Sequence, residues 1–118
     1  MTQFGEYLRQ RREELQKQEP GKFSVRKLAA LVDIEPSYLS KIERGQQPPP
    51  GERTIIALAN ALGEDADALL AMAGKVSEDL QKIIRKRPRL FADVIRQLKD
   101  MPDHALLRIV REVRDGNW

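Results

Sequence analysis

Several residue types are missing or scarce in this chain of 118 residues, which has no cysteine and a single histidine. The absence of cysteine excludes disulfide bonds and thiolate metal sites, and a lone His104 excludes a multi-histidine metal cluster. No apolar run approaches the roughly 20 residues that a membrane-spanning helix requires. The first residues lack the basic and then apolar pattern of a secretion signal. We therefore expect a cytoplasmic protein that holds no metal or cofactor and does not enter a membrane.

Helical periodicity, by contrast, runs through the whole sequence. Apolar residues recur at intervals of three and four, and no segment shows the alternation of a strand. Thr2, Ser24 and Asp65 are placed to cap helices, and Gly45 and Gly63 to end them. These signals predict an all-α fold. Its first domain, residues 1–74, is expected to hold five short helices around one core.

Residues 24–45 are the most informative segment, because they combine two helical patterns with a tight turn. Asp33 stands at the corner, where the backbone must be left-handed and Gly, Asn or Asp is tolerated. Ala29 stands where the two helices cross and a larger side chain would separate them. The apolar contacts that such a unit needs are supplied by Leu28, Val32, Ile34, Leu39 and Ile42. The spacing predicts a helix-turn-helix, whose second helix can enter the major groove of DNA.

The second helix of this unit, Pro36–Arg44, has a polar and basic face. Successive helical residues are rotated by about 100°, so Leu39 and Ile42 share the core side. The opposite side carries Ser37, Ser40, Lys41 and Arg44. Lys favours guanine acceptors in the major groove, and Ser can donate to bases or phosphates. The face therefore predicts a DNA contact; the alternative is the solvated face of an ordinary helical hairpin.

The run SYLSKIERG at residues 37–45, with Leu28-Ala29 and Ala61-Leu62-Gly63, resembles the Xre/Cro-type helix-turn-helix regulators, which include phage repressors. The resemblance covers about residues 4–74 and implies a phage-repressor-like DNA-binding domain. It also implies a partly buried ion pair between Arg12 and Glu43, with an architectural role.

The resemblance further implies which residues touch DNA. Base contacts would come from Pro36, Ser37 and Lys41, and phosphate contacts from the start of the preceding helix, at Ser24 and Arg26. Ser40 and Arg44 on the exposed face are added as phosphate contacts. Tyr38 lies on the flank of the helix, where it either binds a phosphate or covers the helix junction.

Three features depart from the family pattern. Val25 stands where Gln is common, so one phosphate contact is either lost or moved to Arg26. Asp33 replaces the usual corner Gly, and the connection at residues 18–23 is longer than usual. The fold tolerates all three departures, whereas the details of DNA contact depend on them.

Residues 75–118 are predicted to form a separate helical element, which Ser77 caps and Pro88 and Pro102 interrupt. Its helices have narrow apolar stripes and charged opposite faces. The stripes indicate a dimer interface, formed by Leu90, Phe91, Val94, Ile95, Leu98, Leu106, Ile109, Val110 and Val113. The alternative is that these helices pack back on their own subunit. The basic surplus also lies here, in Arg85–Arg89 above all, which either touches phosphate or is solvated.

No spacing of Ser, Asp or Glu indicates a hydrolase, and His104 has no nucleophile placed near it, so we do not expect an enzyme. The leading hypothesis is a dimeric transcriptional repressor that binds a palindromic operator in double-stranded DNA. One alternative is an antitoxin that represses its own operon and grips a toxin through its C-terminal helices. Another is a protein-interaction module that no longer binds DNA, which Glu35 beside the second helix weakly favours, since a carboxylate there repels phosphate.

Overall fold

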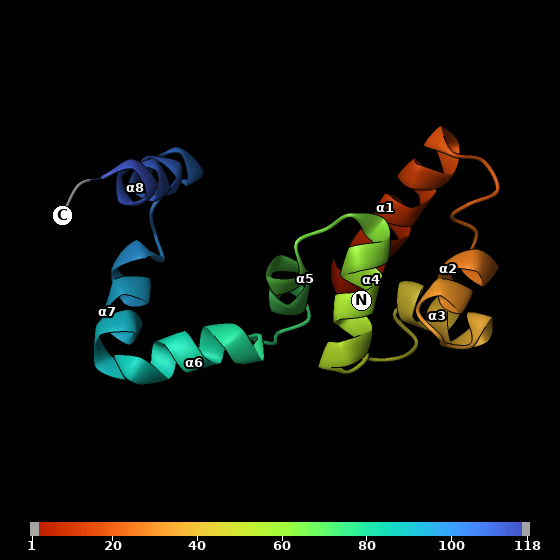
Figure 1. The fold of residues 1–118 in the computed structure, drawn as a ribbon, viewed down its shortest axis with the longest axis horizontal. Helices are drawn as coiled ribbons and strands as arrows, with labels where there is room; N and C mark the ends of the chain where they lie inside the picture. Colours follow the sequence, from red (N-terminus) through yellow and green to blue (C-terminus); the bar gives the residue numbers. More distant parts are fainter. Residues whose placement is uncertain (1–2, 117–118) are drawn as a thin grey trace. The chain divides into compact units, whose positions relative to one another are not determined.

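The structure, a computed structural model that describes residues 3–116, consists of eight helices in that range (Figure 1). They are α1 (Gln3–Gln18), α2 (Val25–Leu31), α3 (Pro36–Glu43), α4 (Glu52–Leu62), α5 (Ala66–Met72), α6 (Glu78–Lys86), α7 (Pro88–Leu98) and α8 (Asp103–Asp115). None of the described residues lies in a strand, so the predicted all-α fold is confirmed. Thr2, predicted to cap the first helix, lies outside the described residues.

The chain divides into two compact units, one up to Leu80 and one from Gln81 onward, whereas the sequence analysis placed the boundary after Gly74. The segment that follows Gly74 still packs on the first unit. Lys75 Nζ donates a hydrogen bond of 3.0 Å to the Pro50 carbonyl oxygen, and Ser77 is only 6% exposed. Such contacts join positions far apart in the sequence, which local periodicity does not reveal.

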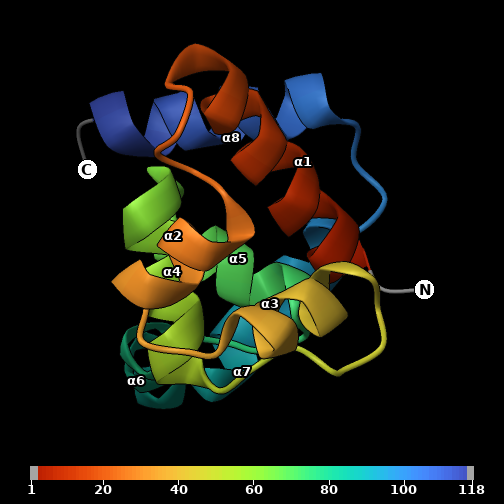
Figure 2. The same cartoon turned by 90° about the vertical axis from the view of Figure 1, so that its right-hand side faces the viewer.

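One apolar core holds the first unit together, and all of α1–α5 contribute to it. Phe4 and Leu8 enter it from the same face of α1, since residues four apart share a face. The other buried apolar residues are Leu28, Ala29, Val32, Leu39, Ile42, Ile55, Leu58, Ala59, Leu62, Leu69 and Leu70. Helices α2 and α3 thus form one wall of a packed domain, and Figure 2 views the molecule from their side.

Capping side chains and glycines define several helix ends in this unit. The Ser24 hydroxyl accepts a hydrogen bond of 3.2 Å from the Lys27 N–H, and the Asp65 carboxylate accepts one of 3.0 Å from the Ala68 N–H. Gly45 and Gly63 follow α3 and α4 with φ of 74° and 68°, a left-handed conformation that glycine adopts without a steric penalty. These four predicted caps are confirmed.

The second unit has no comparable core. Pro88 begins α7 with one residue between it and the end of α6, and α8 begins directly after Pro102, as the sequence predicts. No residue of α6, α7 or α8 is buried. This unit therefore leaves many of its large apolar side chains exposed and buries none of them fully.

Candidate nucleic-acid interface

A tight turn joins α2 to α3. Asp33 has φ of 59°, the left-handed conformation expected at this corner, and it alone among the described non-glycine residues has positive φ. The Ile34 N–H donates a hydrogen bond of 3.0 Å to the Ala29 carbonyl oxygen, which closes the turn. Ala29 is fully buried, as expected for the residue at which the helices cross. The predicted helix-turn-helix is confirmed.

Helix α3 buries one side completely. Leu39, Ile42 and Glu43 are all 5% exposed or less, and they lie on the side of α3 that faces the core. Pro36 begins the helix, where its missing N–H would have no helical partner in any case. The core therefore fixes the rotation of α3 about its axis and decides which side chains face solvent.

The buried carboxylate on α3 is paired with α1. Arg12 Nε and Nη2 donate hydrogen bonds of 2.7 and 2.9 Å to the two carboxylate oxygens of Glu43. Arg12 Nη1 donates a third, of 3.2 Å, to the Phe23 carbonyl oxygen in the connection before α2. The bond to Glu43 raises the pKa of the Arg12 guanidinium above its ordinary value. One side chain thus ties α1, the α1–α2 connection and α3 together.

The outward side of α3 carries Ser37, Lys41 and Arg44, which we call the exposed strip. All three are exposed and lie at intervals of four and three, so they form a line opposite Leu39 and Ile42. No acidic or large apolar side chain interrupts this line. The strip offers one hydroxyl and two cations, groups that suit base acceptors and phosphates in a DNA groove.

Three predicted contacts lie at the edges of the strip rather than on it. Ser40 is half-buried, although the helical rotation placed it on the open side. Tyr38 is also half-buried and packs against the core, which agrees with its alternative role of covering the helix junction. Pro36 is half-buried at the start of the helix. Only the outer parts of these three residues can reach a ligand.

The start of α2 supplies the predicted phosphate contacts. Arg26 is exposed, and Ser24 and Val25 are half-buried. The Ser24 hydroxyl oxygen already accepts the capping bond from Lys27, but its own hydrogen remains available as a donor. Arg26 is accordingly the stronger candidate for a phosphate contact from this helix.

Two carboxylates stand close to this surface. Glu35 is exposed at the N-cap of α3 and makes no capping hydrogen bond with its side chain. Asp33 is exposed at the corner. Both would repel a phosphate placed at the start of α3, whereas the cations Lys41 and Arg44 would attract one.

The loop after α3 adds polar residues to which the sequence analysis gave no role. Gln46 and Gln47 are exposed after Gly45, and the Gln46 N–H donates to the Lys41 carbonyl oxygen at 2.8 Å. The far end of the loop is fixed at Pro50 by Lys75. Gln amides can read adenine or bind phosphate. The two adjacent Gln residues shortly after the second helix could have indicated these additional polar groups from the sequence.

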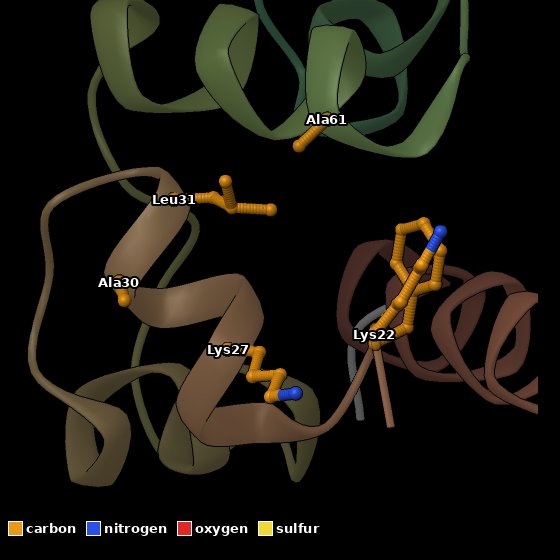
Figure 3. A pocket seen from close by; sticks show the side chains of 6 residues that line it. Lys22, Lys27, Ala30, Leu31 and Ala61 are labelled. Carbon is orange, nitrogen blue, oxygen red and sulfur yellow. The ribbon is translucent and has the colours of Figure 1, made fainter. Parts of the chain in front are cut away.

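A mostly apolar groove with a volume of about 480 Å³ lies on another part of this unit. It is lined by Lys22, Phe23, Lys27, Ala30, Leu31 and Ala61. Figure 3 shows Leu31 of α2 and Ala61 of α4 pointing toward one another across it. Leu31 is 66% exposed. None of the lining residues is a predicted DNA contact, so this groove is separate from the exposed strip.

The residues predicted to form a dimer interface lie on α7 and α8. Leu90, Val94, Ile95, Val110 and Val113 are between 43% and 58% exposed. The half-buried members are Phe91, Leu98, Leu106 and Ile109. Exposed apolar side chains grouped in this way are typical of surfaces that contact another molecule.

Within residues 3–116, no helix is both long and apolar enough to cross a bilayer, and no three potential metal ligands of the His, Cys, Asp or Glu type lie together. A family model described as a helix-turn-helix domain matches residues 3–72, which is more than half of the chain and includes all of α1–α5. Comparisons with curated proteins and with solved structures found no match.

Proposed function

The chain belongs to the helix-turn-helix domain family, and from this membership we propose that it is a sequence-specific DNA-binding transcriptional regulator of the Xre/Cro type. In this proposal it is a cytoplasmic homodimer that represses transcription by occupying a palindromic operator. Repression needs no further parts, because a protein bound at a promoter is enough to block it.

The exposed strip of α3 is the observation that supports this proposal most directly. Leu39 and Ile42 anchor one side of α3 in the core, and Ser37, Lys41 and Arg44 stand on the other. Reading helices in this family of motifs enter the major groove and contact bases with their first residues. We assign base contacts to Ser37 and Lys41, with Pro36 beside them. Phosphate contacts are assigned to Ser24, Arg26, Tyr38, Ser40 and Arg44.

The surface of the second unit supports dimerisation. One helix-turn-helix contacts only a few base pairs, so specific sites usually combine two half-sites about one helical turn apart. Two copies of α7 and α8 would cover one another's apolar side chains, none of which is fully buried within one unit. We therefore assign the dimer interface to the stripe that includes Leu90, Ile95 and Val110.

Titration of the protein with the DNA upstream of its own coding region, against a shuffled duplex of equal length, tests the proposal. We expect binding of the upstream duplex to be tighter, and the logarithm of its affinity to fall linearly with the logarithm of salt concentration, by about 0.9 per phosphate neutralised. Equal affinity for both duplexes at physiological salt would contradict sequence-specific regulation.

A protein-interaction module is the second candidate, and Glu35 favours it. An exposed carboxylate at the start of α3 opposes phosphate there. In this case neither duplex would bind, and Glu35→Gln would not restore binding. An antitoxin would bind its own upstream DNA, and a toxin would occupy the apolar stripe of α7 and α8 in place of a second copy.

A further inference from the structure

The two units of the chain carry opposite net charges. Residues 1–80 hold eleven Lys and Arg against thirteen Asp and Glu, a net charge of −2. Residues 81–118 hold ten Lys and Arg against five Asp and Glu, a net charge of +5. The unit with the helix-turn-helix therefore gives DNA little long-range attraction, and the positive field of the chain arises from the other unit.

Half of the cations in the second unit are concentrated at one place. The segment from residue 82 to residue 92 contains five cations and no acid, namely Lys82, Arg85, Lys86, Arg87 and Arg89, which we call the basic corner. All five are exposed. Arg85 has bonding partners, with Gln81 at 3.4 Å among them, whereas no carboxylate among residues 3–116 forms a salt bridge with the other four.

The backbone holds these cations together. Arg87 is the single residue between α6 and α7, and Pro88 begins α7. The Arg87 N–H donates to the Ile84 carbonyl oxygen at 3.1 Å, and its own carbonyl oxygen accepts from the Phe91 N–H at 3.0 Å. The corner is thus an ordered connection between two helices, unlike a flexible basic tail, and like charges are kept side by side at an energetic cost.

The basic corner and the apolar stripe lie on different faces. On α6, Lys82 and Lys86 are four residues apart, and a rotation of about 100° per residue puts Ile84 on the opposite side. On α7, Arg89 is likewise opposite Phe91 and Leu98. A second copy that covers the stripe would leave the corner open.

From these observations we propose that the basic corner is a second DNA site, which binds phosphates of the duplex beyond the bases that α3 reads. The inference rests on the proposed function, because the helix-turn-helix brings the duplex to the same chain. Once α3 is bound, the corner is tethered to the same duplex, so its weak contacts would add to the affinity of the whole chain. Clustered cations bind phosphate without reading sequence, and the site would strengthen binding to any duplex.

A pair of variants with equal charge tests the site. The corner variant replaces Lys82, Lys86, Arg87 and Arg89 with Gln, and the control replaces Arg96, Lys99, Arg108 and Arg111 with Gln. The salt slope is the steepness with which the logarithm of DNA affinity falls as the logarithm of salt concentration rises. The corner variant should lower this slope by up to about 3.6 per protomer, which is about 0.9 for each of four phosphates. It should also weaken DNA binding at least tenfold. The control should change the slope by less than about 1. Circular dichroism checks that both variants fold.

A measurement on nearly unaltered protein covers the case in which a quadruple variant does not fold. The chain has no cysteine, so Lys86→Cys provides a unique thiol for an iron chelate that cleaves nearby DNA. We expect cleavage of the flanking duplex from position 86 and none from a chelate on Arg111→Cys.

Several results would overturn the inference while leaving the proposed function intact. Operator binding with the same salt slope in the corner and control variants would do so, as would absence of cleavage from position 86. A corner variant that binds DNA like the parent but no longer binds phosphatidylserine vesicles would assign the corner to a membrane surface instead. Conversely, equal affinity for operator and shuffled duplex, together with a slope reduced only in the corner variant, would support the corner and refute the proposed specificity.

Discussion

Arg12 of α1 and Glu43 of α3 form a bidentate ion pair, with Nε–Oε2 and Nη2–Oε1 distances of 2.7 and 2.9 Å. Glu43 is on the helix proposed to read DNA, but its side chain is only 4% exposed and points away from the exposed strip. The pair therefore sets where α3 lies, and it takes no part in the contact itself. Mutation of Arg12 should therefore lower the stability of the fold without changing which bases the protein prefers.

Arg12→Ala should lower the free energy of unfolding by about 3–5 kcal/mol, because it leaves a buried carboxylate without its partner. Urea denaturation measures this loss, and base preference should be unchanged. Arg9→Ala is the matched control, since Arg9 pairs with Glu13 on the same helix at 3.6 Å with both side chains about half exposed. Such a surface pair contributes roughly 0.5 kcal/mol. Equal stability of the two variants would show that the buried pair contributes no more than a surface pair.

Lys41→Ala should relax base preference at one position of each half-site, at a cost of roughly 1–3 kcal/mol for the preferred base. Arg26→Ala should weaken all duplexes alike and reduce the salt slope by about 1, because a phosphate contact carries no sequence information. Selection from a randomised operator, read by sequencing, separates the two effects. Unaltered base preference in Lys41→Ala would refute the assignment of the exposed strip as the reading face.

Asp33 provides a test of the turn itself. Its φ of 59° is left-handed, and Asp33→Val should lower stability by about 1–2 kcal/mol, since a β-branched side chain is poorly accommodated there. Asp33→Gly should leave stability equal or slightly higher. Thermal unfolding compares the two variants. A Val variant as stable as the Gly variant would mean that the corner does not hold this conformation in solution.

Much of the first unit could be predicted because its signals are local. The caps at Ser24 and Asp65 and the left-handed Asp33 are each decided by residues within one turn, and the structure confirms them. The packing of residues 75–80 on the first unit could not be predicted, because it involves contacts between distant parts of the sequence, such as the bond from Lys75 to Pro50.

The site shows the same division between local and long-range effects. Helical rotation placed Ser37 and Lys41 on the open side, where they lie. It did not predict that Ser40 would be half-buried, because a helical projection ignores the residues of neighbouring elements that cover its edges. The partner of α7 and α8 could not be identified either, since a single sequence does not show which other molecule covers an exposed face.

The apolar stripe of the second unit provides the test of dimerisation. Leu90 and Ile95 are each 58% exposed, so replacing both with Asp removes little from the fold of one subunit. In a dimer the same charges would be buried without partners, and the chain should become monomeric with operator binding weakened by at least about a hundredfold. Sedimentation velocity at tens of micromolar gives the state of association. Leu31→Asp, at a somewhat more exposed position in the first unit, should remain dimeric.

Salt should act on the dimer and on the DNA complex in opposite directions. Two second units, each with a net charge of +5, repel one another, and added salt screens this repulsion while leaving apolar contact intact. The dimer should therefore become tighter as salt rises from about 50 to about 300 mM. Over the same range, operator binding should weaken, because less free energy is gained from the release of counterions. Sedimentation equilibrium and DNA titration across the same salt series measure the two trends.

A parent chain that stays monomeric throughout the series, yet binds its operator tightly, would show that α7 and α8 do not join two copies. A dimer that weakens as salt rises would instead indicate that ion pairs hold it, and the Leu90 and Ile95 stripe would not be its main contact.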